Sequence, residues 1–447
     1  MAKIDTLPPG PGLIVTADFL RNPFRFLDRC AQRFGDWFTV RVPGVPTFVF
    51  TSDPGAIRDV FLGDPDILHA GEANRPLGAF MGERSVLFLD GAAHLEERRF
   101  VTPAFHGERM RAYTDTMRAA ADRAIESWQI GTQFPIHREM RTITFDVIIR
   151  AVFGLKDEHE SARIRWLLER LFALYTSRLG TLFALPVFQA DLGPLSPWGR
   201  AVRINRELNT LLFAEFKRRR DDGASGREDI LSVLLAARDE AGAPMSDESL
   251  RDEMLTLVLA GHETTAATLA WVMNRLLSNP DVMERARSEV RAVLDGETLR
   301  ATHIDQLKFL EAVVNETMRL DPVVPNVARV LKKPARIGGR GLPADIAVAP
   351  CIYLAQRRPD LWSEPERFDP ERFVAARPTA SAFFPFGGGS RRCIGAAFAM
   401  HQMKIVLAEI LARVEIEAVA NYKARPVRRS IAFAPSKGMP VRATRRL

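Results

Sequence analysis

The chain has 447 residues, 47% hydrophobic and 26% charged, the balance of a globular protein whose core is large enough to enclose a cofactor. Its formal net charge is +7, but the basic residues are spread along the chain, which excludes the concentrated basic stripe that nucleic-acid binding requires. Cys30, Cys351 and Cys393 are an odd number of scattered cysteines, so we expect a reducing compartment and no disulfide scaffold.

The N-terminal segment is rich in proline and glycine and contains no apolar run that could serve as a signal or membrane anchor. We therefore expect a cytoplasmic protein without a membrane anchor. Residues 23–34 are predicted to form a short helix. Residues 37–42 and 47–50 then alternate in polarity around a Pro-Gly-Val-Pro turn, which predicts a β-hairpin.

Residues 70–90 are irregular and apolar, which buried loop packing alone would explain. A helix is predicted to open at Gly91, with His94 and Arg98 one turn apart on one face. A surface cluster with Glu97 would explain these charges equally well. Helical patterns then run almost unbroken over 110–239, with interruptions at Gly131, near Gly154, at 193–194 and at 221–226.

Residues 246–278 form the longest helical pattern, with Ser246 as a plausible N-cap and Asn279-Pro280 as its end. Apolar residues lie nearly all round this segment, which predicts a buried helix. Such a helix should not hold Gly-His-Glu-Thr-Thr at 261–265 without a functional cause. A zincin motif is excluded, because position 266 is Ala where the second histidine ligand would stand.

Another capped helix is predicted over Asp305 to Leu320, and it places Glu316 and Arg319 on one face, where they could be a simple surface pair. Strand-like runs follow around 327–331 and 346–348, separated by glycine-rich turns. A weaker pattern over 431–437 suggests a terminal hairpin.

The loop Phe386–Gly395 reads Phe-Gly-Gly-Gly-Ser-Arg-Arg-Cys-Ile-Gly and precedes a helix predicted from Ala396 to about Val414. Cys393 thus sits at or just before a helix N-terminus, where unpaired N–H groups favour a thiolate. Such a thiolate suits an axial ligand of haem iron. A phosphate-binding glycine loop and a buried structural cysteine are the alternatives.

This loop resembles the haem-ligand signature of the cytochrome P-450 superfamily. The matching residues are Phe, Gly, Arg, Cys and Gly at offsets 0, 3, 5, 7 and 9 from Phe386. Residues 260–265 resemble its oxygen-binding segment, and Glu316-x-x-Arg319 with the Phe-x-Pro-x-Arg-Phe stretch at 368–373 resembles its structural triad. The resemblance implies a mainly α fold with small β-sheets. It implies one domain over 1–447, β-rich at about 37–65 and 323–350, with haem b buried between the long central helix and the helix after the cysteine loop.

The resemblance also assigns roles. Cys393 would bind the iron, with Phe386, Arg391 and Gly395 around it. His94, Arg98 and Arg329 would hold the haem propionates, although a tryptophan is frequent where His94 stands. Gly261 would leave room for dioxygen, Thr264 would donate to it, and Glu263 would relay protons. Glu316, Arg319 and Arg372 would brace the cysteine loop. The expected substrate-lining residues are Phe80, Leu87, Phe88, Ala260, Val323, Val324 and Val327.

The implied activity is that of a haem-thiolate monooxygenase, using O2 as cosubstrate to hydroxylate a hydrophobic small molecule. A fatty acid is favoured, because Ala-Gly-His-Glu-Thr-Thr resembles bacterial fatty-acid hydroxylases; terpenoids and steroids stay open. No flavin or ferredoxin segment follows, so electrons would come from a separate ferredoxin and NAD(P)H ferredoxin reductase, with Arg391, Arg392 and Lys404 near the docking surface. We expect a monomer. A peroxide-using hydroxylase and a non-catalytic haem sensor or carrier are the alternatives.

Overall fold

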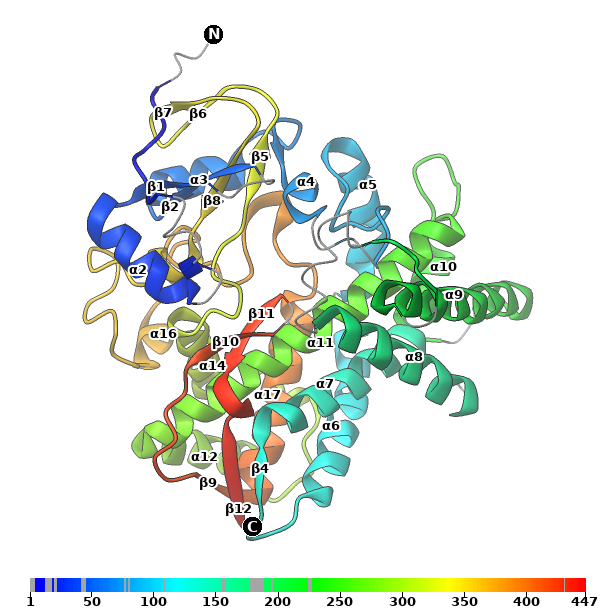
Figure 1. Ribbon diagram of the computed structural model, residues 1–447. Coiled ribbons are helices and arrows are strands. Elements are labelled where there is room, and N and C mark those ends of the chain that lie inside the picture. The colour runs from blue at the N-terminus through cyan, green and yellow to red at the C-terminus, as the bar shows by residue number, and fades with distance from the viewer. Residues whose placement is uncertain are drawn as a thin grey trace.

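The computed structural model describes residues 5–12, 18–19, 22–41, 46–75, 78, 81–105, 107, 109–154, 158–176, 189–193, 196–223, 227–429 and 431–447. Helices dominate the described residues, and a strand-rich region lies at one side of the molecule beside the N-terminal helices (Figure 1). The expectation of a mainly α protein with small sheets is confirmed.

The predicted hairpin exists as β1 (Trp37–Val40) paired antiparallel with β2 (Thr47–Thr51), and Phe38 lies opposite Phe50. On its other edge β2 pairs in parallel with β8 (Ile346–Pro350). Strand β8 pairs antiparallel with β5 (Arg329–Leu331), and β5 pairs antiparallel with β3 (Leu68–His69). The order β1-β2-β8-β5-β3 therefore joins two segments about 300 residues apart in sequence into one sheet.

Helices pack on both sides of this sheet. Asn22 caps α2 (Pro23–Phe34), whose Phe26 and Leu27 are buried in a cluster with Phe38 and Phe50. On the other side α3 (Pro54–Leu62) begins at an Asp53 cap. The remaining elements near the sheet are short: α4 (Ala70–Asn74), β6 (Ala335–Ile337), β7 (Arg340–Leu342), α15 (Ile352–Ala355) and α16 (Glu371–Ala375).

The helical part begins with α5 (Gly91–Val101) and a 3-10 turn at Thr102–Phe105. Its further helices break where glycine or turn residues interrupt the pattern, as predicted: α6 (Arg109–Ser127), α7 (Ile136–Phe153), α8 (Glu158–Thr176), α9 (Pro197–Asp222) and α10 (Ile230–Ala236). Residues 182–185, an apolar run that suits either a cavity roof or ordinary core, lie outside the described residues.

The long helix α11 (Asp247–Ser278) confirms the predicted central element, and the Ser246 side chain caps it by accepting from the Ser249 N–H. It crosses the molecule diagonally in Figure 1, with α7 packed along it. Most of its side chains are buried, which explains why its sequence is apolar on nearly every face.

The helix expected to begin at Asp305 begins three residues later. A single turn, α13 (Ala301–Ile304), ends before α14 (Lys308–Leu320), so the predicted start was wrong. No side chain of the preceding residue caps α14. Glu289 of α12 (Pro280–Leu294) instead accepts from the N–H groups of Phe309 and Leu310, a long-range cap that local sequence does not encode.

The helix after the cysteine loop is α17 (Ala396–Arg413), which packs against α6 and reaches the core. A three-stranded sheet closes this end in the order β4-β12-β9, from β4 (Gln133–Pro135), β9 (Val414–Ala418) and β12 (Pro440–Arg446). The terminal hairpin is β10 (Pro426–Arg429) with β11 (Ala432–Pro435), followed by a 3-10 turn at Ser436–Gly438.

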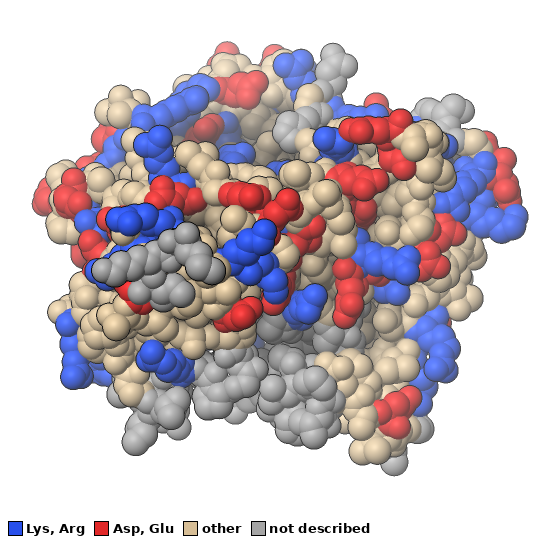
Figure 2. All heavy atoms as spheres, turned by 90° about the horizontal axis from the view of Figure 1, so that it is seen from above, with Lys and Arg blue, Asp and Glu red and all other residues tan. Residues whose placement is uncertain are grey.

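Among the described helices, none combines the length and apolar character that a bilayer span requires. Lysine and arginine are interspersed with aspartate and glutamate over the face in Figure 2, with no continuous basic stripe.

Candidate functional site

The cysteine loop is held in place by a close approach to α3. Gly389 has a φ of +65°, and a Cβ built there would lie 1.9 Å from the Phe61 carbonyl oxygen, so only glycine fits. The Cys393 N–H donates to the Phe386 carbonyl at 2.9 Å, and α17 starts three residues later. The loop therefore presents Cys393 just before a helix N-terminus, as predicted.

The Cys393 thiol is exposed, yet enough protein surrounds it that burial raises its pKa. The Gly395 N–H, Arg392 and Arg98 lower that pKa, as the sequence suggested, but burial outweighs them. A Cβ built on Gly395 would touch nothing within 4 Å. The thiol is therefore accessible, and no atom crowds the Cβ position of Gly395 two residues further on.

Four basic side chains, those of His94, Arg98, Arg329 and Arg391, gather around the cysteine loop. Burial, followed by Arg391, Arg98 and Arg329, lowers the pKa of His94 to about 3, and its buried Nδ1 has no hydrogen-bond partner. Burial is also the main cause that lowers the pKa of Arg329 and of Arg391 to about 10. Asp90 is the carboxylate that faces both arginines. The cluster carries more buried positive charge than this carboxylate balances, which suits an anionic ligand.

Hydrogen bonds tie these cations to the loop and its surroundings. Arg98 of α5 donates to the Arg392 carbonyl at 2.7 Å. Arg391 forms an ion pair with Asp90 at 2.5 Å and also donates to the carbonyls of Val86 and Leu89. The expected propionate-binding residues therefore lie together around the cysteine loop.

The segment before α5 is fastened to the N-terminal half of α11. Asp252 accepts from the Arg84 N–H at 3.0 Å, Glu253 accepts from the Val86 N–H, and Thr256 donates to Ser85 at 3.0 Å. Leu87 is partly exposed in this segment, while Phe88 is buried with its ring beside Gly78. Phe80 lies outside the described residues.

A partly exposed stripe interrupts the buried surface of α11. Leu257, Ala260 and Thr264 lie at i, i+3 and i+7, on one helix face, and the Thr264 hydroxyl donates to the Ala260 carbonyl at 2.8 Å. A Cβ built on Gly261 would lie 3.0 Å from Ile148 Cδ1 of α7, so the missing side chain allows α7 to pack close to α11. The expected role of Gly261 beside bound oxygen stays a prediction.

Glu263 is buried and turned toward α7. Arg141 donates to its Oε2 at 2.8 Å, and Nε2 of His137 lies 3.7 Å from its Oε1. His262 is buried, and its ring contacts those of Phe145 and Phe172. Sequence reasoning missed Arg141 and His137, although their spacing of four on a largely apolar helix was a usable signal.

The other expected lining residues approach the same region from the loop before β5. Val323 packs on Ala267 of α11, and its carbonyl accepts from the Phe433 N–H at 2.9 Å. Val327 is close to the cysteine loop, because a Cβ on Gly387 would lie 3.8 Å from its Cγ1. Val324 is partly exposed between them.

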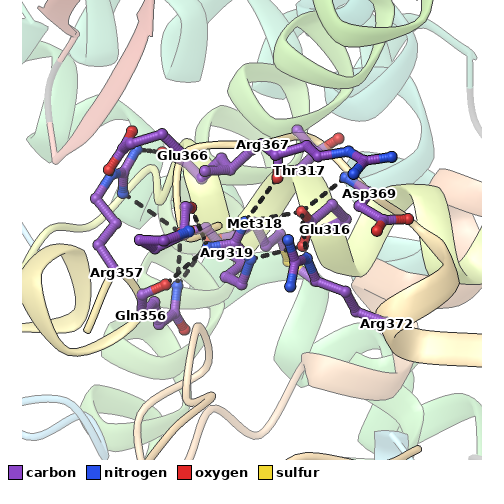
Figure 3. A network of polar contacts seen from close by, with 12 residues as sticks. Glu316, Thr317, Met318, Arg319, Gln356, Arg357, Glu366, Arg367, Asp369 and Arg372 are labelled. Carbon is purple, nitrogen blue, oxygen red and sulfur yellow. Dashed lines mark hydrogen bonds and ion pairs between the residues drawn. The ribbon is translucent and has the colours of Figure 1, made fainter. Parts of the chain in front are cut away.

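The predicted triad forms a buried network (Figure 3). Arg319 binds both carboxylate oxygens of Glu316 at 2.6 and 2.8 Å and donates to the carbonyls of Gln356, Pro365 and Arg367. Arg372 lies 3.6 Å from Glu316. Gln356 extends the network, since its Oε1 accepts from the N–H of Phe384, two residues before the cysteine loop.

Two residues expected at a docking surface are not available there. Lys404 is buried and paired with Glu311 at 2.9 Å, and Arg391 is engaged by Asp90. Of the three named residues, Arg392 alone is exposed, next to the exposed Gly389 and Ser390.

The site therefore combines an accessible cysteine sulfur with a largely buried cationic cluster, on a mainly helical fold. These features suit an anionic cofactor that a cysteine sulfur could bind. The family model "Cytochrome P450" matches residues 8–439. The chain belongs to the cytochrome P450 family, whose members are haem monooxygenases.

The chain is similar to several bacterial relatives. It is 37% identical over 445 residues to "Putative cytochrome P450 135B1" of Mycobacterium tuberculosis, covering 98% of this chain and 92% of that protein. It is 36% identical over 426 residues to "Putative cytochrome P450 137" of the same organism, covering 95% and 86%.

Solved structures agree on the fold. "Retinoic acid bound cyanobacterial CYP120A1" has a TM-score of 0.84 at 26% identity and covers 99% of both chains. The cytochrome P450DA heme domain has a TM-score of 0.87 at 24% identity, covering 100% of this chain and 99% of that one.

Replacing Arg319 by Met should lower the free energy of unfolding by about 3–5 kcal/mol, because the fully buried Glu316 carboxylate would lose the guanidinium that binds both its oxygens and keep only Arg372 and one backbone N–H. The control Arg367→Met removes a 62% exposed side chain paired with Glu364, which should cost about 1 kcal/mol or less. Denaturant unfolding of the purified variants measures both. Equal losses in the two variants would contradict the bracing role of the buried network.

Proposed function

We propose that this P450 monooxygenase hydroxylates an apolar carboxylic acid, a fatty acid in the first instance, with electrons supplied by a separate ferredoxin and its NAD(P)H-dependent reductase. The proposal treats residues 1–447 as one haem-binding domain. The single observation that carries it is the accessible Cys393 thiol, in a loop around which four basic side chains gather. A cytoplasmic location and a monomeric state stay predictions.

The residues present fit haem b. Cys393 Sγ would bind the iron, and Phe386 and Gly395 would flank it. The two propionates would be held by His94, Arg98, Arg329 and Arg391. Guanidinium groups form charged hydrogen bonds with carboxylates, and a neutral imidazole can donate one hydrogen bond to them. His94 is neutral at physiological pH, so it would contribute a hydrogen bond through its unpartnered Nδ1. Bound haem supplies the reductive activation of dioxygen, which a thiolate ligand promotes.

Two residues of α11, Thr264 and Glu263, would supply protons to the site. The Thr264 hydroxyl donates to Ala260, so it can turn its proton to a ligand on the partly exposed stripe. Burial raises the pKa of Glu263, and Arg141 lowers it. A carboxyl group with a raised pKa holds a proton more readily than a free one, which suits a proton relay.

Apolar residues support the substrate class. Ala260, Val323, Val324, Val327 and Leu87 are partly exposed or line the region beside the α11 stripe. The solved relative at 26% identity was crystallised with retinoic acid, itself an apolar carboxylic acid. We expect long-chain fatty acids to shift the haem absorption spectrum in a titration. A response to terpenes or steroids alone would overturn the fatty-acid assignment.

Thr264→Ala should uncouple NAD(P)H consumption from product and raise peroxide release about tenfold or more, since it removes a positioned proton donor. The matched control is Thr265→Ala, whose hydroxyl also bonds the carbonyl four residues back but whose side chain is buried away from the stripe. Product and peroxide per NAD(P)H are the quantities to measure. Tight coupling in Thr264→Ala would refute the role.

Arg392→Glu should slow reduction by an acidic ferredoxin, with an effect that shrinks as salt rises, because Arg392 is the exposed charge next to the cysteine loop. Stopped-flow reduction of the holoenzyme tests this. Arg336→Glu, an exposed change on β6, should leave the rate unchanged. An unaltered rate in Arg392→Glu would place the electron donor elsewhere.

A further inference from the structure

Three carboxyl groups are buried together where α5 meets the N-terminal half of α11, and we call them the carboxyl cluster. Glu97 of α5 is 8% exposed, and Asp252 and Glu253 of α11 are 3% and 0% exposed. Among the described residues, no group of His, Cys, Asp or Glu side chains is placed to hold a metal ion, so a bound metal does not account for the cluster.

Two members of the cluster fasten the segment 82–90, which leads into α5, to the long helix α11. Glu253 accepts from the Val86 N–H, and Asp252 accepts from the Arg84 N–H at 3.0 Å. Backbone N–H groups in an irregular segment need such acceptors, because no helix or sheet supplies them. The position of the segment therefore depends on these two carboxyl groups.

The same segment borders the candidate site. Arg391 of the cysteine loop donates to the carbonyls of Val86 and Leu89, and Leu87 between them is one of the expected substrate-lining residues. The segment is thus held by the cysteine loop on one side and by the carboxyl cluster on the other. Its release from α11 would loosen the chain next to the expected substrate region.

Little positive charge faces the cluster. Arg251 pairs with Asp252 at 2.8 Å. The side chain of Arg84 is 62% exposed and lies 3.9 Å from Glu248, a further negative group at the edge of the cluster. Glu96 on α5 adds negative charge from the other side. One close arginine cannot balance three buried carboxylates, so the cluster favours retained protons.

The hydrogen bonds of Glu97 and Glu253 lead to the same conclusion. Oε1 of Glu97 and Oε2 of Glu253 are buried and have no hydrogen-bond partner. A buried carboxylate oxygen without a partner is costly, whereas a protonated carboxyl group carries no charge. Burial is the main cause that raises the pKa of Glu97 to about 7 and that of Glu253 well above its ordinary value.

We propose that the carboxyl cluster is a pH-sensitive latch, which holds the segment 82–90 on α11 while it is protonated and releases it when it ionises. The inference is independent of the proposed substrate. In the released segment the carboxyl groups meet water and recover their ordinary pKa, which for Glu97 is 4.5. The latched form is therefore favoured most below pH 4.5 and loses stability as the pH rises to about 7, and Glu253 extends this loss to higher pH.

Glu97→Gln keeps the neutral shape of the side chain and should remove its part of this pH dependence. Amide hydrogen exchange over residues 82–90 of the ferric holoenzyme measures the release. The ratio of wild-type to variant exchange rates, which cancels the intrinsic effect of pH on exchange, should rise about tenfold or more from about pH 5.5 to about pH 8.5. The reason is that each pH unit between the two pKa values of Glu97 changes the equilibrium tenfold.

Two further variants complete the test. Glu253→Gln should give the same rising ratio, and it replaces Glu97→Gln if that variant does not fold. Glu409→Gln is the matched control, because burial also raises the pKa of Glu409 to about 7 but the residue lies on α17 beside Asp122. It should exchange like the wild type at every pH.

A ratio that does not change with pH in the folded variant would overturn the latch. A matching change in Glu409→Gln would overturn it as well, since the pH effect would then not belong to the carboxyl cluster. Exchange is measured without substrate, electron donor or turnover, so either failure is distinguishable from failure of the monooxygenase proposal.

Discussion

The buried guanidinium of Arg319 is the contact on which the site depends. It is taken out of water, so each of its donors must find an acceptor, and Glu316 with three backbone carbonyls supplies them. These carbonyls belong to residues within 356–367. The Gln356 side chain also accepts from the N–H of Phe384, which lies just before the cysteine loop, and so links this network to the loop. A single desolvated charge thereby fixes irregular backbone that has no sheet or helix of its own to hold it.

The candidate site is assembled from segments far apart in the chain. The cysteine loop supplies the thiol, α5 supplies His94 and Arg98, β5 supplies Arg329, and α11 supplies the partly exposed stripe that contains Thr264. Backbone contacts and ion pairs join them: Arg98 to the Arg392 carbonyl, Arg391 to Asp90, and the segment before α5 to Asp252 and Thr256. The same bonds that order the loops therefore also position the groups suited to an anionic cofactor.

Sequence predicted what is local. The Ser246 cap, the hairpin at 37–51 and the spacing around Cys393 are short-range patterns, and the structure has each of them. The sequence could not predict which side chains from other elements tertiary packing brings into contact. Glu289 caps α14 from another helix, Glu311 pairs with the buried Lys404, and Ile148 of α7 packs against Gly261. The raised pKa of Cys393 was missed for a similar reason, since burial depends on the whole fold.

The central claim is that the sulfur of Cys393 binds the haem iron. The most direct measurement is the absorption spectrum of the dithionite-reduced holoenzyme under carbon monoxide. We expect the band characteristic of thiolate-bound haem in the native protein and in Cys351→Ala, whose thiol is buried against the Pro325 carbonyl, and its loss in Cys393→Ala. Absence of the band from the native protein, or its survival in Cys393→Ala, would contradict the account.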